Sequence, residues 1–178
     1  NDAPDTFPLG ETVVTWTATD SSGNSATAAQ TVSIVDTTAP SITAPDGVEL
    51  EATSPGSTVD IGNPVYDDLV DIASVTNDAP DTFPLGETVV TWTATDSSGN
   101  SATATQTVSV VDTTAPSISS PNNITIEATG AIGNLVDMGI STANDIVEII
   151  SIVNDAPDTF PLGETVVTWT ATDSSGNS

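Results

Sequence analysis

Acidic side chains are the main groups in this sequence that could do chemistry. The 178 residues carry 25 Asp and Glu side chains and no Lys, Arg, His or Cys, so the formal net charge is −25. Catalysis by a histidine base, a lysine Schiff base or a cysteine thiolate is therefore excluded, and so is a zinc site built on thiolate or imidazole. The metal chemistry that remains is that of a hard cation such as Ca²⁺, which binds carboxylate, amide and carbonyl oxygens.

Two sets of oxygen-bearing side chains recur at matching positions along the chain. The first set is Asp36, Asp67, Asp68, Asp71, Asp96 and Asn100. The second set is Asp112, Asn144, Asp145, Glu148, Asp173 and Asn177. Each set combines a linker, a loop and a hairpin turn, which gather at one end of a β-sandwich. Carboxylates placed there would repel one another unless an ion lay between them, which predicts a calcium site at each domain junction.

A simpler interpretation assigns the same aspartates to turns. Asp36 and Asp112 each precede Thr-Thr and can cap a turn, while Asp96 and Asp173 can accept backbone hydrogen bonds in the turns that follow them. The remaining acidic residues would then be solvated surface. The sequence leaves both interpretations open.

The charge and the short strands also exclude other classes of protein. A chain with no positive side chain cannot neutralise phosphates, so neither nucleic acid nor an anionic membrane surface is an expected partner. No apolar run approaches the roughly 18 residues that span a bilayer, so we expect no membrane insertion in this segment. The Asp-Ser-Ser-Gly string lacks the spacing of an aspartic protease, and a small sandwich offers no deep cleft for a glycosidase pair. We therefore expect no enzyme.

Internal repetition organises the chain. The string NDAPDTFPLGETVVTWTATDSSGNS occurs unchanged at residues 1–25, 77–101 and 154–178, and DTTAPSI occurs at residues 36–42 and 112–118. Such identity between blocks is the signature of a tandem array.

The repeated blocks define the predicted domains, with a period of about 76 residues. Residues 1–35 are the C-terminal part of one repeat, residues 36–111 are a complete repeat, and residues 112–178 are a repeat without the counterpart of its last strand. The chain has neither an initiator Met nor a signal-peptide pattern, so we expect it to be a segment of a longer protein.

Alternating apolar residues predict β-strands throughout. In the strand Glu87–Asp96, Val90, Trp92 and Ala94 share one face, and a hairpin loop follows. The residues expected to face inward on the return strand are Ala102, Ala104, Val108 and Val110. Shorter strands are expected at residues 41–43, 48–52, 59–61 and 72–76. Frequent turn signals without a helical period predict tandem immunoglobulin-like antiparallel β-sandwiches, an all-β fold.

The aromatic residues recur at fixed places in the repeat. Trp16, Trp92 and Trp169 share a face with Val and Ala, so we expect core anchors and not exposed platforms for sugars. The same expectation covers Phe7, Phe83 and Phe160.

The repeats share a series of motifs: DTTAPxI, xEAT, an acidic cluster and TNDAPDTFPLGETVVTWTATDSSGNSATATQTV. This series resembles the hyalin repeat (HYR) module over the whole chain. The resemblance implies an immunoglobulin-like sandwich found in tandem in extracellular and cell-surface proteins, with roles in adhesion and matrix structure. The family usually reads close to TATDN in the middle segment. Here that segment is Val65-Tyr-Asp-Asp68 in one repeat and Thr142-Ala-Asn-Asp145 in the next, so a site there can differ between repeats.

The leading functional hypothesis is a non-catalytic structural segment of a long extracellular array that forms a cell-surface stalk, fibre or filament. Calcium at the junctions would stiffen it. The alternative is an adhesion module that binds a carbohydrate or protein receptor through the segments that differ between repeats, residues 46–76 and 122–153.

The chain itself is the expected partner, together with divalent cations. A polymer could be one continuous covalent array, or separate chains that complete each other by strand donation, because residues 112–178 lack a last strand. The Asp-Thr-Thr-Ala-Pro segments at residues 36–40 and 112–116 look like ordinary covalent linkers, which favours the continuous array.

Overall fold

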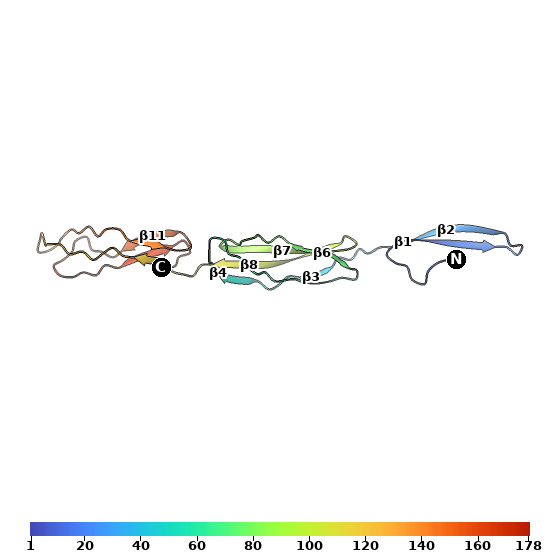
Figure 1. The fold of residues 1–178 in the computed structure, drawn as a ribbon, viewed down its shortest axis with the longest axis horizontal. Coiled ribbons are helices and arrows are strands. Elements are labelled where there is room, and N and C mark those ends of the chain that lie inside the picture. The colour runs from blue at the N-terminus through green and yellow to red at the C-terminus, as the bar shows by residue number, and fades with distance from the viewer. The chain divides into compact units, whose positions relative to one another are not determined.

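The computed structural model describes all 178 residues and is all-β, as the strand patterns predict (Figure 1). The strands are β1 (Gly10–Thr19), β2 (Ser25–Ile34), β3 (Ser41–Thr43), β4 (Val48–Glu51), β5 (Val65–Asp67), β6 (Ile72–Asn77), β7 (Gly86–Asp96), β8 (Ser101–Val111), β9 (Ser117–Ser119), β10 (Thr142–Asn144), β11 (Ile149–Asn154) and β12 (Trp169–Asp173). No helix in the structure could cross a membrane.

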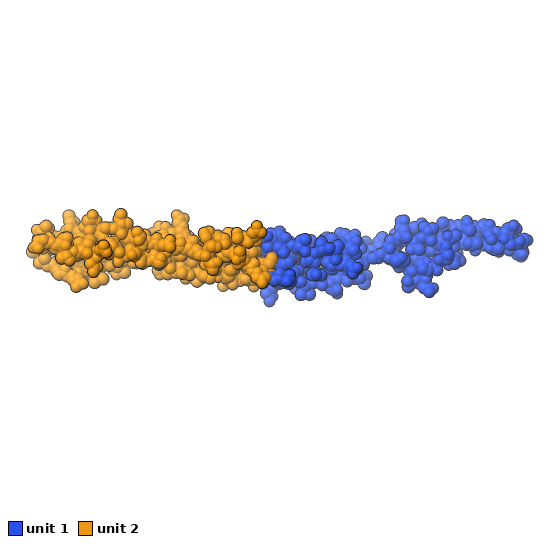
Figure 2. Space-filling view, viewed as in Figure 1, with its two compact units in different colours: residues 1–46, 62–79, 90–106 blue, residues 47–61, 80–89, 107–178 orange.

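Residue contacts divide the chain into two compact units (Figure 2). The first comprises residues 1–46, 62–79 and 90–106, and the second comprises residues 47–61, 80–89 and 107–178. The candidate site residues of residues 36–100 fall in the first unit, and those of residues 112–177 fall in the second.

The complete repeat contains a four-stranded sheet and a two-stranded one. The larger sheet has the order β4-β8-β7-β6, with β4 parallel to β8 and β6 antiparallel to β7, and β3 pairs antiparallel with β5. β8 is therefore an inner strand of the sheet, between β4 and β7 (Figure 1). This is the immunoglobulin-like arrangement that the alternating patterns predict.

The core of the complete repeat forms where the alternation predicts it. Val90, Trp92 and Ala94 on β7 are buried, as are Val108 and Val110 on β8. Branched and aromatic side chains on the inner face of a sheet supply most of the burial energy of such a small domain.

A buried glutamine on β8 was not predicted. The Trp92 Nε1–H donates to the Gln106 Oε1 atom at 3.1 Å, and the Gln106 Nε2–H donates to the Asp46 carbonyl oxygen at 2.9 Å. Gln106 lies at an inward position of the alternation, and its two bonds satisfy the polar atoms that burial would otherwise leave unpaired.

Residues 1–35 form a hairpin in which β1 pairs with β2 from Gly10 to Thr19. Trp16 is 50% exposed, whereas Trp92 at the same place in the complete repeat is 4% exposed. The prediction that Trp16 is a core anchor is therefore wrong for this hairpin. The alternation of β1 is that of a core strand, but residues 1–35 form no second sheet that could cover the face carrying Trp16.

Two further expectations differ from the structure. The strand expected at residues 59–61 does not form; instead, Ser57 and Phe83 make a single bridge, with N–H to carbonyl distances of 2.9 and 2.8 Å. The segment Val65–Asp67, in contrast, forms β5 against β3. Short strands depend on a partner at the right distance, which a local pattern does not specify.

Residues 112–178 hold two separate two-stranded sheets, β10-β9 and β11-β12. Asn134 and Phe160 make a bridge equivalent to that of Ser57 and Phe83. Residues 124–127 and 163–168, the counterparts of β4 and of the first part of β7, are not strands.

Candidate metal centre

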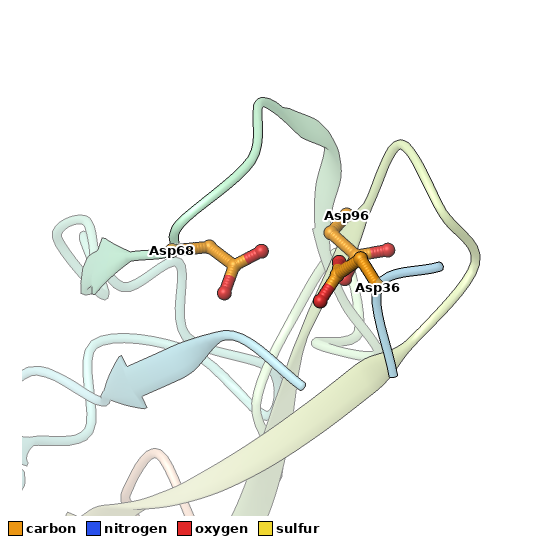
Figure 3. A group of neighbouring side chains, drawn as sticks. All are labelled: Asp36, Asp68 and Asp96. Carbon is orange, nitrogen blue, oxygen red and sulfur yellow. The ribbon is translucent and has the colours of Figure 1, made fainter. Parts of the chain in front are cut away.

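Three carboxylates from separate segments of the complete repeat meet at one place (Figure 3). Asp36 lies in the linker before β3, Asp68 lies between β5 and β6, and Asp96 ends β7. One carboxylate oxygen of each lies within 4.8 Å of the others. In Figure 3 the Asp68 carboxylate extends toward the adjacent carboxylates of Asp36 and Asp96. We refer to these three residues as the first aspartate cluster.

The turn after β7 fixes the position of Asp96. Its Oδ1 accepts the backbone N–H groups of Ser98 and Asn100, both at 2.8 Å, and its Oδ2 accepts the Asn100 Nδ2–H at 2.8 Å. Gly99 has a φ of 93°, a left-handed conformation that glycine adopts without strain, which lets the turn close. The carboxylate is therefore held rigidly, with 1% of the residue exposed.

Asn100 connects Asp96 to the linker. Its Nδ2–H also lies 3.3 Å from both the Asp36 carbonyl oxygen and the Asp36 Oδ2. The Asp36 Oδ1 accepts the Thr38 N–H at 3.1 Å. The turn interpretation is thus confirmed for Asp36 and Asp96. The amide nitrogen of Asn100 faces the carboxylates, so in this orientation Asn100 donates hydrogen bonds to the cluster.

Asp68 differs from the other two members. Its Oδ2 atom is buried and has no hydrogen-bond partner. A buried carboxylate oxygen costs free energy unless a donor or a cation compensates it. No Lys, Arg or His exists in the chain to do so. Asp68 belongs to a group of three neighbouring acidic side chains, which is an environment that a hard cation would neutralise.

The second aspartate cluster, Asp112, Asp145 and Asp173, repeats this geometry within residues 112–178. The Asn177 Nδ2–H lies 3.2 Å from both the carbonyl oxygen and the Oδ2 of Asp112, and 3.0 Å from the Asp173 Oδ2. Asp145 again has a buried Oδ2 with no partner. The three-aspartate cluster with one unpaired buried oxygen is therefore a feature of both repeats.

The pKa values of the two turn aspartates are lowered. Burial alone raises the pKa of Asp96 and of Asp173, but the hydrogen bonds from Asn100 or Asn177, and from the backbone of the turn, outweigh it. Both carboxylates therefore stay ionised at neutral pH, the form that binds a metal.

Three predicted acidic ligands, Asp67, Asp71 and Glu148, lie outside the two aspartate clusters. With Asn144 they share a different role. Their carbonyl oxygens accept hydrogen bonds from serines, 2.9 Å for Asp67 with the Ser41 Oγ–H and 2.8 Å for Glu148 with the Ser174 N–H. These residues hold the loops around the clusters in place through their backbone.

Glu51 is a residue of the junction that the sequence did not single out. Its Oε1 accepts the Thr113 N–H at 2.8 Å and the Thr114 Oγ1–H at 2.9 Å, and its Oε2 accepts the Thr113 Oγ1–H at 2.9 Å. These bonds lower the pKa of Glu51. The available signal was the Glu-Ala-Thr triplet, which recurs at Glu127.

The Glu51 bonds attach the end of β4 to the linker that leads to β9. Asp112 in the same linker belongs to the second aspartate cluster. The linker between repeats is therefore held from both sides by carboxylates, through hydrogen bonds at Thr113 and Thr114 and through the cluster at Asp112.

Comparison with known proteins agrees with the repeated architecture. The HYR domain model matches residues 35–110 and 111–178. The chain belongs to the HYR domain family. The two matched HYR segments each carry one complete aspartate cluster.

Two relatives of this HYR chain are hyalins. The chain is 41% identical to the hyalin of Lytechinus variegatus over 97% of its own length, and 39% identical to the hyalin of Strongylocentrotus purpuratus over 99%. It spans 36% and 16% of the lengths of those two proteins. A sushi, von Willebrand factor type A, EGF and pentraxin domain-containing protein 1 of Rattus norvegicus is 40% identical over 55% of the chain, which spans 3% of that protein. No solved structure gives a significant match.

Proposed function

We propose that this HYR chain is a non-catalytic, extracellular adhesion-type segment. The junction between its repeats determines how stiff the segment is. The segment serves as a length of stalk or fibre at a cell surface, and a calcium ion in each aspartate cluster stiffens the junction. The observation that carries the proposal is that a linker residue, Asp36 or Asp112, completes each three-carboxylate cluster.

The donor set suits Ca²⁺. The ion takes six to eight oxygens, and each cluster offers three carboxylates, one of which has an unpaired buried oxygen. Asp36, Asp68 and Asp96 would hold the first ion, and Asp112, Asp145 and Asp173 the second. Backbone carbonyls and water would supply the remaining oxygens. Because the linker aspartate is a ligand, an ion would tie the linker to the loops of the repeat that follows it.

The relatives support an extracellular site of action for the array. The segment similar to this chain makes up 36% of the Lytechinus variegatus hyalin and 3% of the sushi, von Willebrand factor type A, EGF and pentraxin domain-containing protein 1. A tandem array in which each repeat contacts its neighbours gains length and stiffness without needing a cleft in any single unit. The absence of His, Cys and Lys from the chain fits a role without catalysis.

Calcium titration tests the metal-dependent part of the proposal. Isothermal titration should give two ions per chain, and the unfolding midpoint should rise with Ca²⁺ above its value in NaCl of equal ionic strength. Mg²⁺ at the same concentration should raise the midpoint less, because it demands a smaller octahedral site and dehydrates reluctantly. An unchanged midpoint in Ca²⁺ would refute the calcium sites.

Electron microscopy tests the structural part separately. Negative-stain images of a tandem array of these repeats should show regular fibres whose bending increases when a chelator is added. Fibres whose stiffness does not change with chelator would support the structural role and contradict the role of calcium. Compact particles would contradict the structural role.

A further inference from the structure

One segment of residues 112–178 has the form of an acceptor for an N-linked sugar. Asn123-Ile-Thr125 reads Asn-X-Thr, with X other than Pro, and no other triplet of the chain has this form. Its counterpart in the complete repeat is Gly47-Val-Glu49, since Pro45 and Pro121 precede the two triplets at the same distance and Glu-Ala-Thr follows both. Only one of the two HYR segments therefore carries the acceptor.

The complete repeat shows where this triplet lies in the fold. Gly47 comes directly before β4, and β4 is an outer strand of the four-stranded sheet, with β8 as its one neighbour. Gly47 and Glu49 are exposed although β8 pairs with β4. A residue at either place therefore faces solvent in a complete sheet, at an edge with unpaired backbone groups.

The space around Gly47 admits a side chain. A Cβ built there would meet one atom within 4 Å outside the neighbouring residues of the chain, the carbonyl oxygen of Thr107 at 3.2 Å. That contact is tight and needs a small shift, but the other directions are open. Asn123 and Thr125, at the matching places of the other segment, are themselves exposed. An enzyme can therefore reach the Asn123 amide, and a bulky group on it need not enter the core.

The two edge segments differ in charge. Residues 46–51 read DGVELE and residues 122–127 read NNITIE, so Asn122 replaces Asp46 and Thr125 replaces Glu49. Charged side chains on an outer strand oppose its pairing with another chain. The Ile-Thr-Ile run has a high strand propensity and keeps only the charge of Glu127 beside it. The second segment therefore lacks two of the carboxylates that shield this edge in the complete repeat.

We propose that Asn123 is a site of N-glycosylation and that its glycan shields this edge in place of the two missing carboxylates. The donor is an oligosaccharide carried on a polyprenyl pyrophosphate. The Asn123 Nδ2 atom forms a bond to C1 of the first sugar and loses a proton. The C1–O bond breaks, and the lipid pyrophosphate leaves with the bonding electrons, so nothing is oxidised or reduced. A bulky, hydrophilic group beside the edge keeps a second strand away, as charge does.

Expression in a secreting eukaryotic cell line tests the acceptor. The 178-residue chain is placed behind a cleavable signal peptide, and the cell supplies the transferase and the lipid-linked donor. The chain has no Lys or Arg, so peptides are cut at Asp and Glu for mass spectrometry. We expect one glycan per chain, at Asn123, that peptide:N-glycosidase removes.

Variants of the triplet give the controls. Asn123→Gln and Thr125→Ala should carry no glycan, whereas Thr125→Ser keeps the hydroxyl and should carry it. Both positions are exposed, so the variants should fold with unchanged circular dichroism. A secreted chain without a glycan, or a glycan that persists in Asn123→Gln, would overturn the assignment of Asn123.

Association of the purified chains tests the shielding. Light scattering compares them at about 0.15 M salt, where repulsion between exposed charges is screened beyond about 8 Å. We expect Asn123→Gln to associate at lower concentration than the glycosylated chain. Thr125→Glu also lacks the glycan but restores one carboxylate, so it should associate less than Asn123→Gln. All three chains have the same ends, so any other edge contributes equally.

Two results would overturn the shielding role. One is equal association of the glycosylated chain and Asn123→Gln, and the other is equal association of Thr125→Glu and Asn123→Gln. The inference rests on the extracellular location in the proposed function and on neither calcium nor stiffness. A chain glycosylated at Asn123 that binds no calcium would contradict the proposed calcium sites alone. A chain that binds two calcium ions but carries no glycan would contradict this inference alone.

Discussion

The carboxylate of Asp96 both holds a turn and belongs to an aspartate cluster. The Oδ1 of Asp96 holds the turn through Ser98 and Asn100, while the same carboxylate forms one wall of the first aspartate cluster. The turn interpretation and the metal interpretation, which looked like alternatives in the sequence, are therefore compatible. Turn bonds fix the carboxylates in place without an ion, and a fixed site binds a cation with less loss of freedom.

Replacement of the unpaired aspartate tests the first cluster. Asp68→Asn removes one charge and leaves the shape of the side chain unchanged, so we expect the number of calcium ions bound per chain to fall from two to one. The matched control is Asp67→Asn, the neighbouring exposed residue of β5 whose carboxylate lies outside the cluster. Calorimetric titration of both variants measures the stoichiometry. Equal stoichiometry in the two variants would contradict the assignment of Asp68.

The lowered pKa values predict an acid-sensitive fold. The pKa of Asp96 and of Asp173 is lower in the folded chain than the value of about 3.9 in an unfolded one, so their contribution to stability is complete above about pH 4. It is lost as the pH falls through the lower, folded pKa. Unfolding midpoints measured in chelator from pH 7 to pH 2 should therefore drop below about pH 4.

The Asp96→Asn variant is the control for this acid titration. It cannot titrate, so its midpoint should depend less on pH in the same window. A midpoint of the unaltered chain that rises on acidification would contradict the prediction, since it would mean that repulsion among the carboxylates outweighs the turn bonds.

At the scale of elements, one sequence occupies three environments. The strand motif GETVVTWTATD appears in β7, in β1 and in residues 163–173. Only in β7 does it lie between two strands, and only there is its Trp fully buried. Alternation predicts which residues share a face, but the neighbouring strands decide whether that face is covered.

The buried Trp–Gln pair offers a direct measure of this difference. Gln106→Ala leaves the buried Trp92 Nε1–H without an acceptor, so we expect a loss of about 1–3 kcal/mol in the free energy of unfolding. Gln30→Ala removes the same bond from the exposed Trp16, where water replaces the acceptor, and should cost less than about 0.5 kcal/mol. Urea denaturation of both variants measures the difference, and similar losses would contradict it.

At the scale of the whole molecule, acidic residues hold the linker between the two HYR segments. The linker at residues 112–114 is held by Glu51 and by the second aspartate cluster. All of these groups are acidic residues or their hydrogen-bond donors, so we expect the linker to respond to protonation of the carboxylates and to any cation that they bind. A chain with 25 negative charges and no positive ones has no internal ion pair that could replace them.

Loss of the Glu51 bonds should loosen this joint. Glu51→Gln keeps the length of the side chain but replaces one carboxylate oxygen by an N–H₂ group, so the side chain is uncharged and cannot accept all three hydrogen bonds from Thr113 and Thr114. With dyes on Asp81→Cys and Asp158→Cys, single-molecule energy transfer should show a broader distance distribution in the Glu51→Gln chain.

Glu127→Gln is the control for the joint, because it makes the same substitution in the same Glu-Ala-Thr triplet. Its distribution should match that of the unaltered chain. If both variants have the width of the unaltered chain, the Glu51 bonds do not restrain the linker.

The sequence by itself determined the periodicity, the β-class, the inward face of β7 and β8, and the aspartates that hold turns. These properties follow from local alternation and from short-range hydrogen bonds, which depend on residues near one another in the chain. Tertiary structure alone decided which of the twelve candidate ligands meet, that Gln106 is buried, that Glu51 reaches the linker, and that Trp16 is exposed. Each of these depends on which distant segment becomes a neighbour, and identical local sequence carries no information about that.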